Sequence, residues 1–208
     1  MAKLLSKKEQ RRRQMIRFSP LVKKDIARLD PSRILTLDLE TTGLTSDAEI
    51  LQLSILNGRG KVMMNRYFKP LYTERWDEAM AINHITPAKV AHKEPFYLAA
   101  DLVSRLFLKA DLIVGYGIYN DLAWLHTAGV ILPDKPMYLD LAEAFSLVSY
   151  TPAHTHITYA ALNRCAAYYG YGEENWHNSL ADTKATLFCF QQMLADDKAI
   201  FRRHRFPM

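Results

Sequence analysis

Two carboxylates stand two residues apart in the segment ILTLDLETTGL, residues 34–44. Its apolar first half predicts a buried strand, and the Thr42-Gly43 pair predicts the turn that ends the strand. Side chains two residues apart on a strand point to the same face, so Asp38 and Glu40 are expected side by side. Two adjacent carboxylates are costly to ionise together without a cation, and the segment therefore indicates metal-dependent chemistry.

A histidine and an acid lie five residues apart in NWHNSLADTKAT, residues 175–186. On one helix, residues with this spacing are rotated by about 140° from each other. His177 and Asp182 therefore reach one site only if the histidine precedes the helix and the acid lies in its first turn. Asn178 and Ser179 are both good N-cap residues and allow this arrangement. The segment SLAD is also a capping-box pattern, which explains Asp182 equally well as a helix-capping acid.

A fourth acid, Asp121, follows the segment IVGYGIYN, which predicts a buried strand and a glycine turn. Taken alone, Asp121 is an acid at a helix start, where the helix macrodipole favours negative charge. Each acid thus has a purely structural explanation. The order and domain-sized spacing of the three motifs favour a common site instead.

Together these motifs resemble those of the DEDDh 3′–5′ exonucleases, which include the proofreading subunits of bacterial replicative polymerases, ribonuclease T and oligoribonuclease. LDLETTGL resembles the first family motif, GYGIYNDLAWL the second and HNSLADTKAT the third, with a histidine marking the subclass. INHITPAKV and TYAALNRCAAYYG are weaker similarities, and the resemblance covers about residues 33–195. Three motifs in register are far more specific than one. The chain departs from many members at Asn83-His84, Tyr116-Gly117 and Asn120, where relatives contact substrate.

The resemblance implies an α/β protein with a ribonuclease H-like mixed β-sheet and helices on both faces. It also implies a metal-dependent 3′–5′ exonuclease that releases nucleoside monophosphates and uses two Mg²⁺ or Mn²⁺ ions. Such an enzyme acts on single-stranded 3′ ends of DNA or RNA, and a DNA polymerase is a candidate partner. We prefer DNA, proofreading or repair, because of the first motif and the basic N-terminus. An exoribonuclease and a non-catalytic nucleic-acid-binding or polymerase-tethering protein are the alternatives.

The resemblance also assigns a role to each site residue. Asp38 would bridge both ions, Glu40 and Asp182 would hold the first, and Asp121 would reach the second. His177 would take a proton from the attacking water, since a histidine titrates near neutral pH. The 3′-terminal nucleotide would contact three further residues: Thr41, Thr42 and Leu44.

The expected secondary structure alternates strands and helices after an antiparallel start. Strands are expected at 33–39, 49–56, 61–69, 111–115 and 139–141. Helices are expected from Thr86, with Pro87 at the first position, then at 95–109, 121–128, from 142 to about 150, at 158–169 and at 179–194.

Composition predicts one cytoplasmic domain between basic ends. The 208 residues suit one core, and no apolar run approaches the roughly 18 residues of a membrane span. The two cysteines are expected as buried, reduced side chains. Residues 1–33 hold eleven Lys or Arg against three acids, a net charge of +8, so the remainder carries −3. We divide the chain into a basic extension (1–32), an exonuclease domain (33–200) and a basic tail (201–208). The extension is either a nucleic-acid contact or a solvated tail.

Overall fold

The computed structural model describes residues 22–134, 136–148, 159–172 and 175–202, and within them a five-stranded mixed sheet. Strand order is β3-β2-β1-β4-β5. The first three strands along the chain are antiparallel neighbours, whereas β1, β4 and β5 run parallel. The strands are β1 Ile34–Thr41, β2 Ile50–Asn57, β3 Val62–Tyr67, β4 Leu112–Gly115 and β5 Met137–Asp140.

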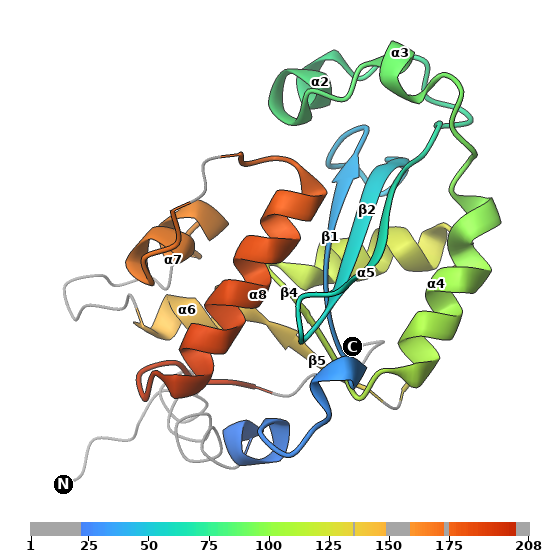
Figure 1. Ribbon diagram of the computed structural model, residues 1–208. Coiled ribbons are helices and arrows are strands. Elements are labelled where there is room, and N and C mark those ends of the chain that lie inside the picture. Colours follow the sequence, from blue (N-terminus) through green and yellow to red (C-terminus); the bar gives the residue numbers. More distant parts are fainter. Residues whose placement is uncertain (1–21, 135, 149–158, 173–174, 203–208) are drawn as a thin grey trace, which may run out of the picture.

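Helices cover both faces of this sheet (Figure 1). Helices α4 and α5 pack on one face, α6, α7 and α8 pack on the other, and α2 and α3 lie beyond the end of β1. Residues 22–26 are also helical. The bounds are η1 Pro31–Arg33, α2 Asp77–Asn83, α3 Pro87–Val90, α4 Tyr97–Lys109, α5 Ile118–Thr127, α6 Leu141–Val148, α7 Leu162–Tyr168 and α8 Ser179–Ala195.

The alternation of β1 divides its side chains between two layers. Leu35, Leu37 and Leu39 belong to the core shared with α4 and α5. Residues of the opposite parity point toward α8, where Thr36 is fully buried and Asp38 and Glu40 follow it along the strand. The alternation of side chains along β1 therefore places the leucines in the core and the two carboxylates on the opposite face of the sheet.

The strand predictions and most helix predictions are confirmed. β1 extends through Thr41, two residues beyond the expected end. The helix at Pro87 forms with Thr86 as its N-cap but has only four residues, and α7 begins at Leu162 rather than 158. Helix α2 was not expected, because its N-cap is Trp76, whose side chain makes no capping hydrogen bond.

Described residues from the expected basic extension (1–32) and basic tail (201–208) belong to the folded body, while 1–21 and 203–208 lie outside the described residues. Val22 and Ile26 are buried in the core under α8, and Phe201 packs against Phe190 of that helix. Cys165 and Cys189 are buried and unbridged, as expected. Among the described residues, no helix is long and apolar enough to cross a membrane.

Candidate active site

Three carboxylates converge on the α8 face of the sheet. Asp38 and Glu40 come from β1 and Asp182 from α8, and each offers an oxygen within 4.8 Å of the other two. Antiparallel register places Asp38 opposite Ser54 and Glu40 opposite Gln52 on β2. The expected pairing of the strand carboxylates is confirmed, and Asp182 of the final helix lies with them, where the resemblance placed it.

Small hydroxyl side chains allow α8 to approach the sheet closely at this point. Ser54 Oγ and Ser179 Oγ are 2.7 Å apart, and the Thr183 hydroxyl donates to the Ser179 carbonyl oxygen. The Ser179 N–H donates to the Gln52 side-chain oxygen at 3.4 Å. Asp182, one turn along, is thereby brought next to the strand carboxylates.

The start of α8 reconciles the two interpretations of Asp182. Asn178 is the N-cap, and its side-chain oxygen accepts from the N–H groups of Leu180 and Ala181. One oxygen of Asp182, Oδ2, accepts the His177 N–H at 3.0 Å, which stabilises the helix start. The other oxygen, Oδ1, is buried without a hydrogen-bond partner. Asp182 is therefore a capping acid through one oxygen and available to a ligand through the other.

His177 lies before α8, as the spacing required. Its φ angle of 61° is left-handed, an uncommon conformation for a residue with a side chain. The imidazole is exposed and outside the group of three carboxylates. The backbone of His177 is thus tied to the site while its side chain projects outward.

Asp121 approaches the same carboxylates from the first turn of α5. That helix begins after Gly117, whose φ of 76° requires the left-handed region that glycine adopts readily. Asp140, at the end of β5, accepts the Gly117 N–H at 2.9 Å and so holds this turn. Because β1, β4 and β5 are parallel, their carboxyl ends meet at one edge and bring Asp121 toward Asp38.

The pKa values of the four acids are all raised, because the carboxylates are buried close to one another. Burial, followed by the charges of Asp121, Asp182 and Glu40, raises the pKa of Asp38 well above its ordinary value. Burial and then Asp140 and Glu40 raise the pKa of Asp121 in the same direction. The pKa of Glu40 rises to about 8, through burial and then Asp182, and burial raises that of Asp182 to about 6.

This arrangement fits a hard divalent cation. The unpartnered Asp182 Oδ1 and the closely spaced oxygens of Asp38 and Glu40 are carboxylate ligands of the type that Mg²⁺ and Mn²⁺ prefer. A bound cation would compensate the buried negative charge that the protein leaves unbalanced.

The three residues expected to hold a terminal nucleotide lie at the end of β1. Thr41 is buried and its hydroxyl donates to the Gly43 carbonyl oxygen at 2.6 Å. The Thr42 backbone and side chain both bond Glu49, which closes the loop between β1 and β2. Leu44 is 92% exposed at the tip of this loop. The loop is held firmly at its base and presents one apolar side chain to solvent.

Three residues beside the site received no role from the sequence. Asn83, at the end of α2, donates to the Thr41 carbonyl oxygen and also lowers the pKa of Glu40. Lys89 lowers the same pKa, and its ammonium lies 4.3 Å from the Tyr67 ring centroid. The INHITPAKV segment contained Asn83 and Lys89 without giving either a role, and nothing in the sequence marked Tyr67, which strand register and helix packing place here.

Comparison with known proteins now identifies the family. A family model described as exonuclease, RNase T, matches residues 35–190. The chain belongs to this exonuclease family. The resemblance to DEDDh exonucleases and the ribonuclease H-like fold are thereby confirmed.

Individual proteins match this chain over part of their length or at low sequence identity. The uncharacterized exonuclease CP81 of Escherichia phage 186 is 35% identical over 92 residues, which is 44% of each chain. Cell-death related nuclease 4 aligns over 79% of this chain and 64% of its own, with 15% identity and a TM-score of 0.62. A product-bound exonuclease I aligns over 80% and 44%, with 18% identity and a TM-score of 0.63. The chain thus spans less than two thirds of the length of these relatives.

One solved structure is covered by the alignment over nearly the whole of its own length. The 3′-exonuclease that recognises the histone mRNA stem-loop aligns over 84% of this chain and 91% of its own. Its TM-score is 0.61 at 15% identity, a level at which the likeness is one of fold. The same architecture therefore occurs in structures named for DNA and for RNA substrates.

Proposed function

We propose that this chain is a metal-dependent 3′–5′ exonuclease that hydrolyses single-stranded nucleic acid to nucleoside monophosphates. The observation that carries the proposal is the convergence of Asp38, Glu40 and Asp182 within 4.8 Å, with a buried carboxylate oxygen left unpartnered. Membership of the exonuclease family supports the reaction class.

Asp38, Glu40 and Asp182 would hold one Mg²⁺ or Mn²⁺ ion, and Asp121 with Asp38 would hold a second. When bound, two such ions supply activation of a water molecule and stabilisation of charge on the attacking and leaving oxygens. The chain contributes a rigid carboxylate frame, because β1 is central in the sheet and α8 is bonded to β2 through Ser54.

His177 is the proposed general base. Its backbone is fixed to Asp182 Oδ2, and its imidazole projects from the loop before α8. A histidine at such a position can accept the proton of the attacking water once substrate has bound and the loop has adjusted. The leaving 3′ oxygen is then protonated from solvent.

Thr41, Thr42 and Leu44 are the proposed contacts of the 3′-terminal nucleotide. The loop is anchored by Glu49 and Asn83, so its backbone groups are preorganised. Leu44 is exposed at the tip, where an apolar side chain can pack against a nucleobase without reading its identity. Such contacts favour a free end over any particular sequence.

We keep single-stranded DNA as the preferred substrate, in proofreading or repair and beside a polymerase, with RNA as the second candidate. The exonuclease I–ssDNA complex among the fold relatives supports DNA, and the histone mRNA 3′-exonuclease supports RNA. The contacts described for Leu44 and the threonines suit either sugar.

The test compares wild type and Asp38→Asn on DNA and RNA of one sequence, labelled at either end, with Mg²⁺, Mn²⁺ or EDTA. We expect a ladder that shortens from the 3′ end, requires metal, and falls by more than about 100-fold in the variant, as loss of a metal ligand implies. A non-catalytic protein of the same fold would bind these strands and release no mononucleotide in any condition. Cleavage that survives Asp38→Asn would disprove the proposed site.

A further inference from the structure

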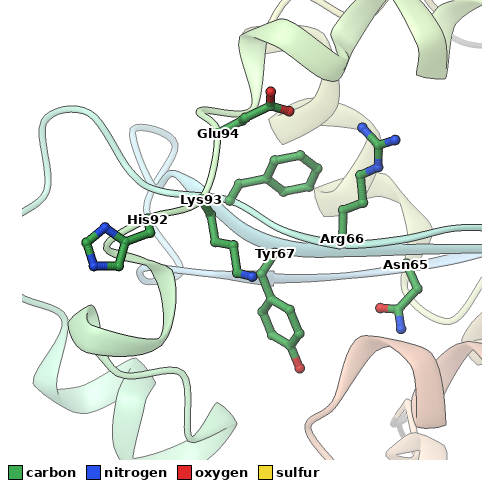
Figure 2. A pocket seen from close by; sticks show the side chains of 7 residues that line it. Asn65, Arg66, Tyr67, His92, Lys93 and Glu94 are labelled. Atoms are coloured by element: carbon green, nitrogen blue, oxygen red, sulfur yellow. The ribbon is translucent and has the colours of Figure 1, made fainter.

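A pocket of about 390 Å³ lies at the outer edge of the sheet, around β3. β3 is an edge strand and supplies Asn65, Arg66 and Tyr67, while the segment after α3 supplies His92 and Lys93. Figure 2 shows these side chains around the strand, with Asn65 and Tyr67 on one side and Arg66 on the other. Because no further strand of the described residues pairs with β3, the outer edge of that strand is open to a ligand at this pocket.

Strand register connects the pocket to the carboxylates. Glu40 lies opposite Gln52, and Gln52 lies opposite Tyr67, so the three side chains form one row on the α8 face. Strands in a sheet are about 4.8 Å apart, which places the Tyr67 backbone about 10 Å from that of Glu40. Gln52 is fully buried and accepts the Ser179 N–H of α8, so the centre of the row is covered. A nucleic-acid strand that runs from the carboxylates to Tyr67 therefore leaves the row there and passes the exposed Lys89, which lies over the Tyr67 ring.

Two contacts fix Tyr67 in this row. Its hydroxyl accepts a hydrogen bond from Asn178, the N-cap of α8, at 3.3 Å. Its ring carries the Lys89 ammonium at 4.3 Å from the centroid, a cation–π contact. Lys89 also acts on Glu40, so one cation lies between the pocket and the carboxylates.

The cations of this edge lie outside the ion pairs of the described part of the chain. Arg66, Lys89 and Lys93 form none of the ion pairs found among the described residues, and all three are exposed. The acid that lines the pocket is Glu94, whose carboxylate points away from the Lys93 amine (Figure 2). Exposed cations that form no ion pair, beside a candidate phosphodiester-cleaving centre, match the charge of a phosphate backbone.

We propose that this pocket binds the sugar–phosphate backbone of the substrate strand, a few nucleotides upstream of its 3′ terminus. Lys93 and Arg66 contact phosphates at the sheet edge, and Lys89 with Tyr67 forms the passage toward the carboxylates. The polarity of the bound strand, with its 3′ end at the carboxylates, rests on the proposed function. Binding of the strand to the pocket is measurable without cleavage. Phosphate contacts of this kind position the strand and carry no sequence information.

The experiment measures the affinity of a fluorescent single-stranded oligonucleotide of about ten nucleotides in EDTA. Wild type is compared with Arg66→Ala/Lys93→Ala and with a control pair, Lys109→Ala/Arg164→Ala. The control removes the same charge from exposed positions on α4 and α7, outside the pocket. Titrations run between about 50 and 200 mM salt, with DNA and RNA of one sequence, and thermal unfolding checks that each variant is folded.

We expect the pocket pair to weaken binding by about 10-fold or more and to reduce the slope of log K against log salt by about 1.4, or 0.7 per lost phosphate contact. The same loss on DNA and RNA supports a backbone contact. An effect no larger than that of the control pair overturns the proposal, and a loss confined to RNA overturns the phosphate assignment in favour of the 2′-hydroxyl.

Hydrolysis separates this inference from the proposed function. Each variant is also assayed on the p-nitrophenyl ester of thymidine 5′-monophosphate, which has no upstream phosphate. Cleavage of the ester by wild type with metal supports the nuclease assignment, and its absence counts against that assignment. The binding result decides the pocket in either case.

Discussion

Replacing Glu40 by glutamine tests two effects of the carboxylate cluster: it binds metal, and it lowers the free energy of unfolding of the metal-free protein. The pKa of Glu40 is raised to about 8 by burial and then by Asp182. The folded protein therefore keeps a proton on this group at pH values where the unfolded chain has released it. Stability that is present below pH 4.5 is lost as the pH rises through about 8.

The magnitude follows from the two pKa values. Each pH unit corresponds to about 1.4 kcal/mol, so the interval from 4.5 to about 8 sets an upper limit of about 5 kcal/mol. Glutamine has nearly the same shape and no charge, so the Glu40→Gln protein escapes this loss. We expect it to be about 2–5 kcal/mol more stable than wild type at pH 8 without metal, which corresponds to a Tm higher by about 5–15 °C.

Thermal unfolding in EDTA at pH values from 5 to 9 measures this difference, and a second series contains Mn²⁺. Metal binds the ionised carboxylates, so it stabilises wild type by about 2.7 kcal/mol at 100 times its Kd. The variant, which lacks one ligand, gains much less and loses nuclease activity by more than about 100-fold. The substitution thus raises stability and removes function together.

Glu74→Gln is the matched control, because Glu74 is exposed in the loop before α2. It is expected to change the free energy of unfolding by less than about 0.5 kcal/mol at every pH. If Glu40→Gln destabilises the metal-free protein at pH 8, or if its Tm follows pH as steeply as that of wild type, the electrostatic account of the site is wrong.

Two further predictions concern substrate contacts. Leu44→Ala should leave the free energy of unfolding within about 0.5 kcal/mol of wild type, because Leu44 is 92% exposed. The same change should raise KM by about 10-fold, because the side chain is proposed to pack on the terminal base. An unchanged KM in steady-state assays would remove Leu44 from the site. Deleting residues 1–21 removes seven Lys or Arg and one acid and should weaken oligonucleotide binding and flatten its salt dependence, with hydrolysis of short strands retained. The deletion ends at residue 21 because Val22 and Ile26 are buried in the core, and an unchanged salt slope would leave the basic extension without a nucleic-acid role.

The sequence by itself determined the local parts of the site. Asp38 and Glu40 share a face because the period of a strand is two, whatever surrounds it. The N-cap preference of Asn178 placed the start of α8 correctly, and with it Asp182 in the first turn and His177 outside the helix. These features depend on neighbouring residues and on backbone geometry alone, which is why they were predictable.

Tertiary structure decided which groups meet. Asp121 is 83 residues from Asp38, and only the parallel pairing of β1 with β4 brings their strand ends together. The row from Glu40 through Gln52 to Tyr67 depends on the register of three strands, which a shift of one residue would turn to the opposite face. The pKa values depend on burial and on charges from distant segments, and composition contains neither. The chain therefore encodes the chemistry locally, while long-range packing sets the distances at which that chemistry works.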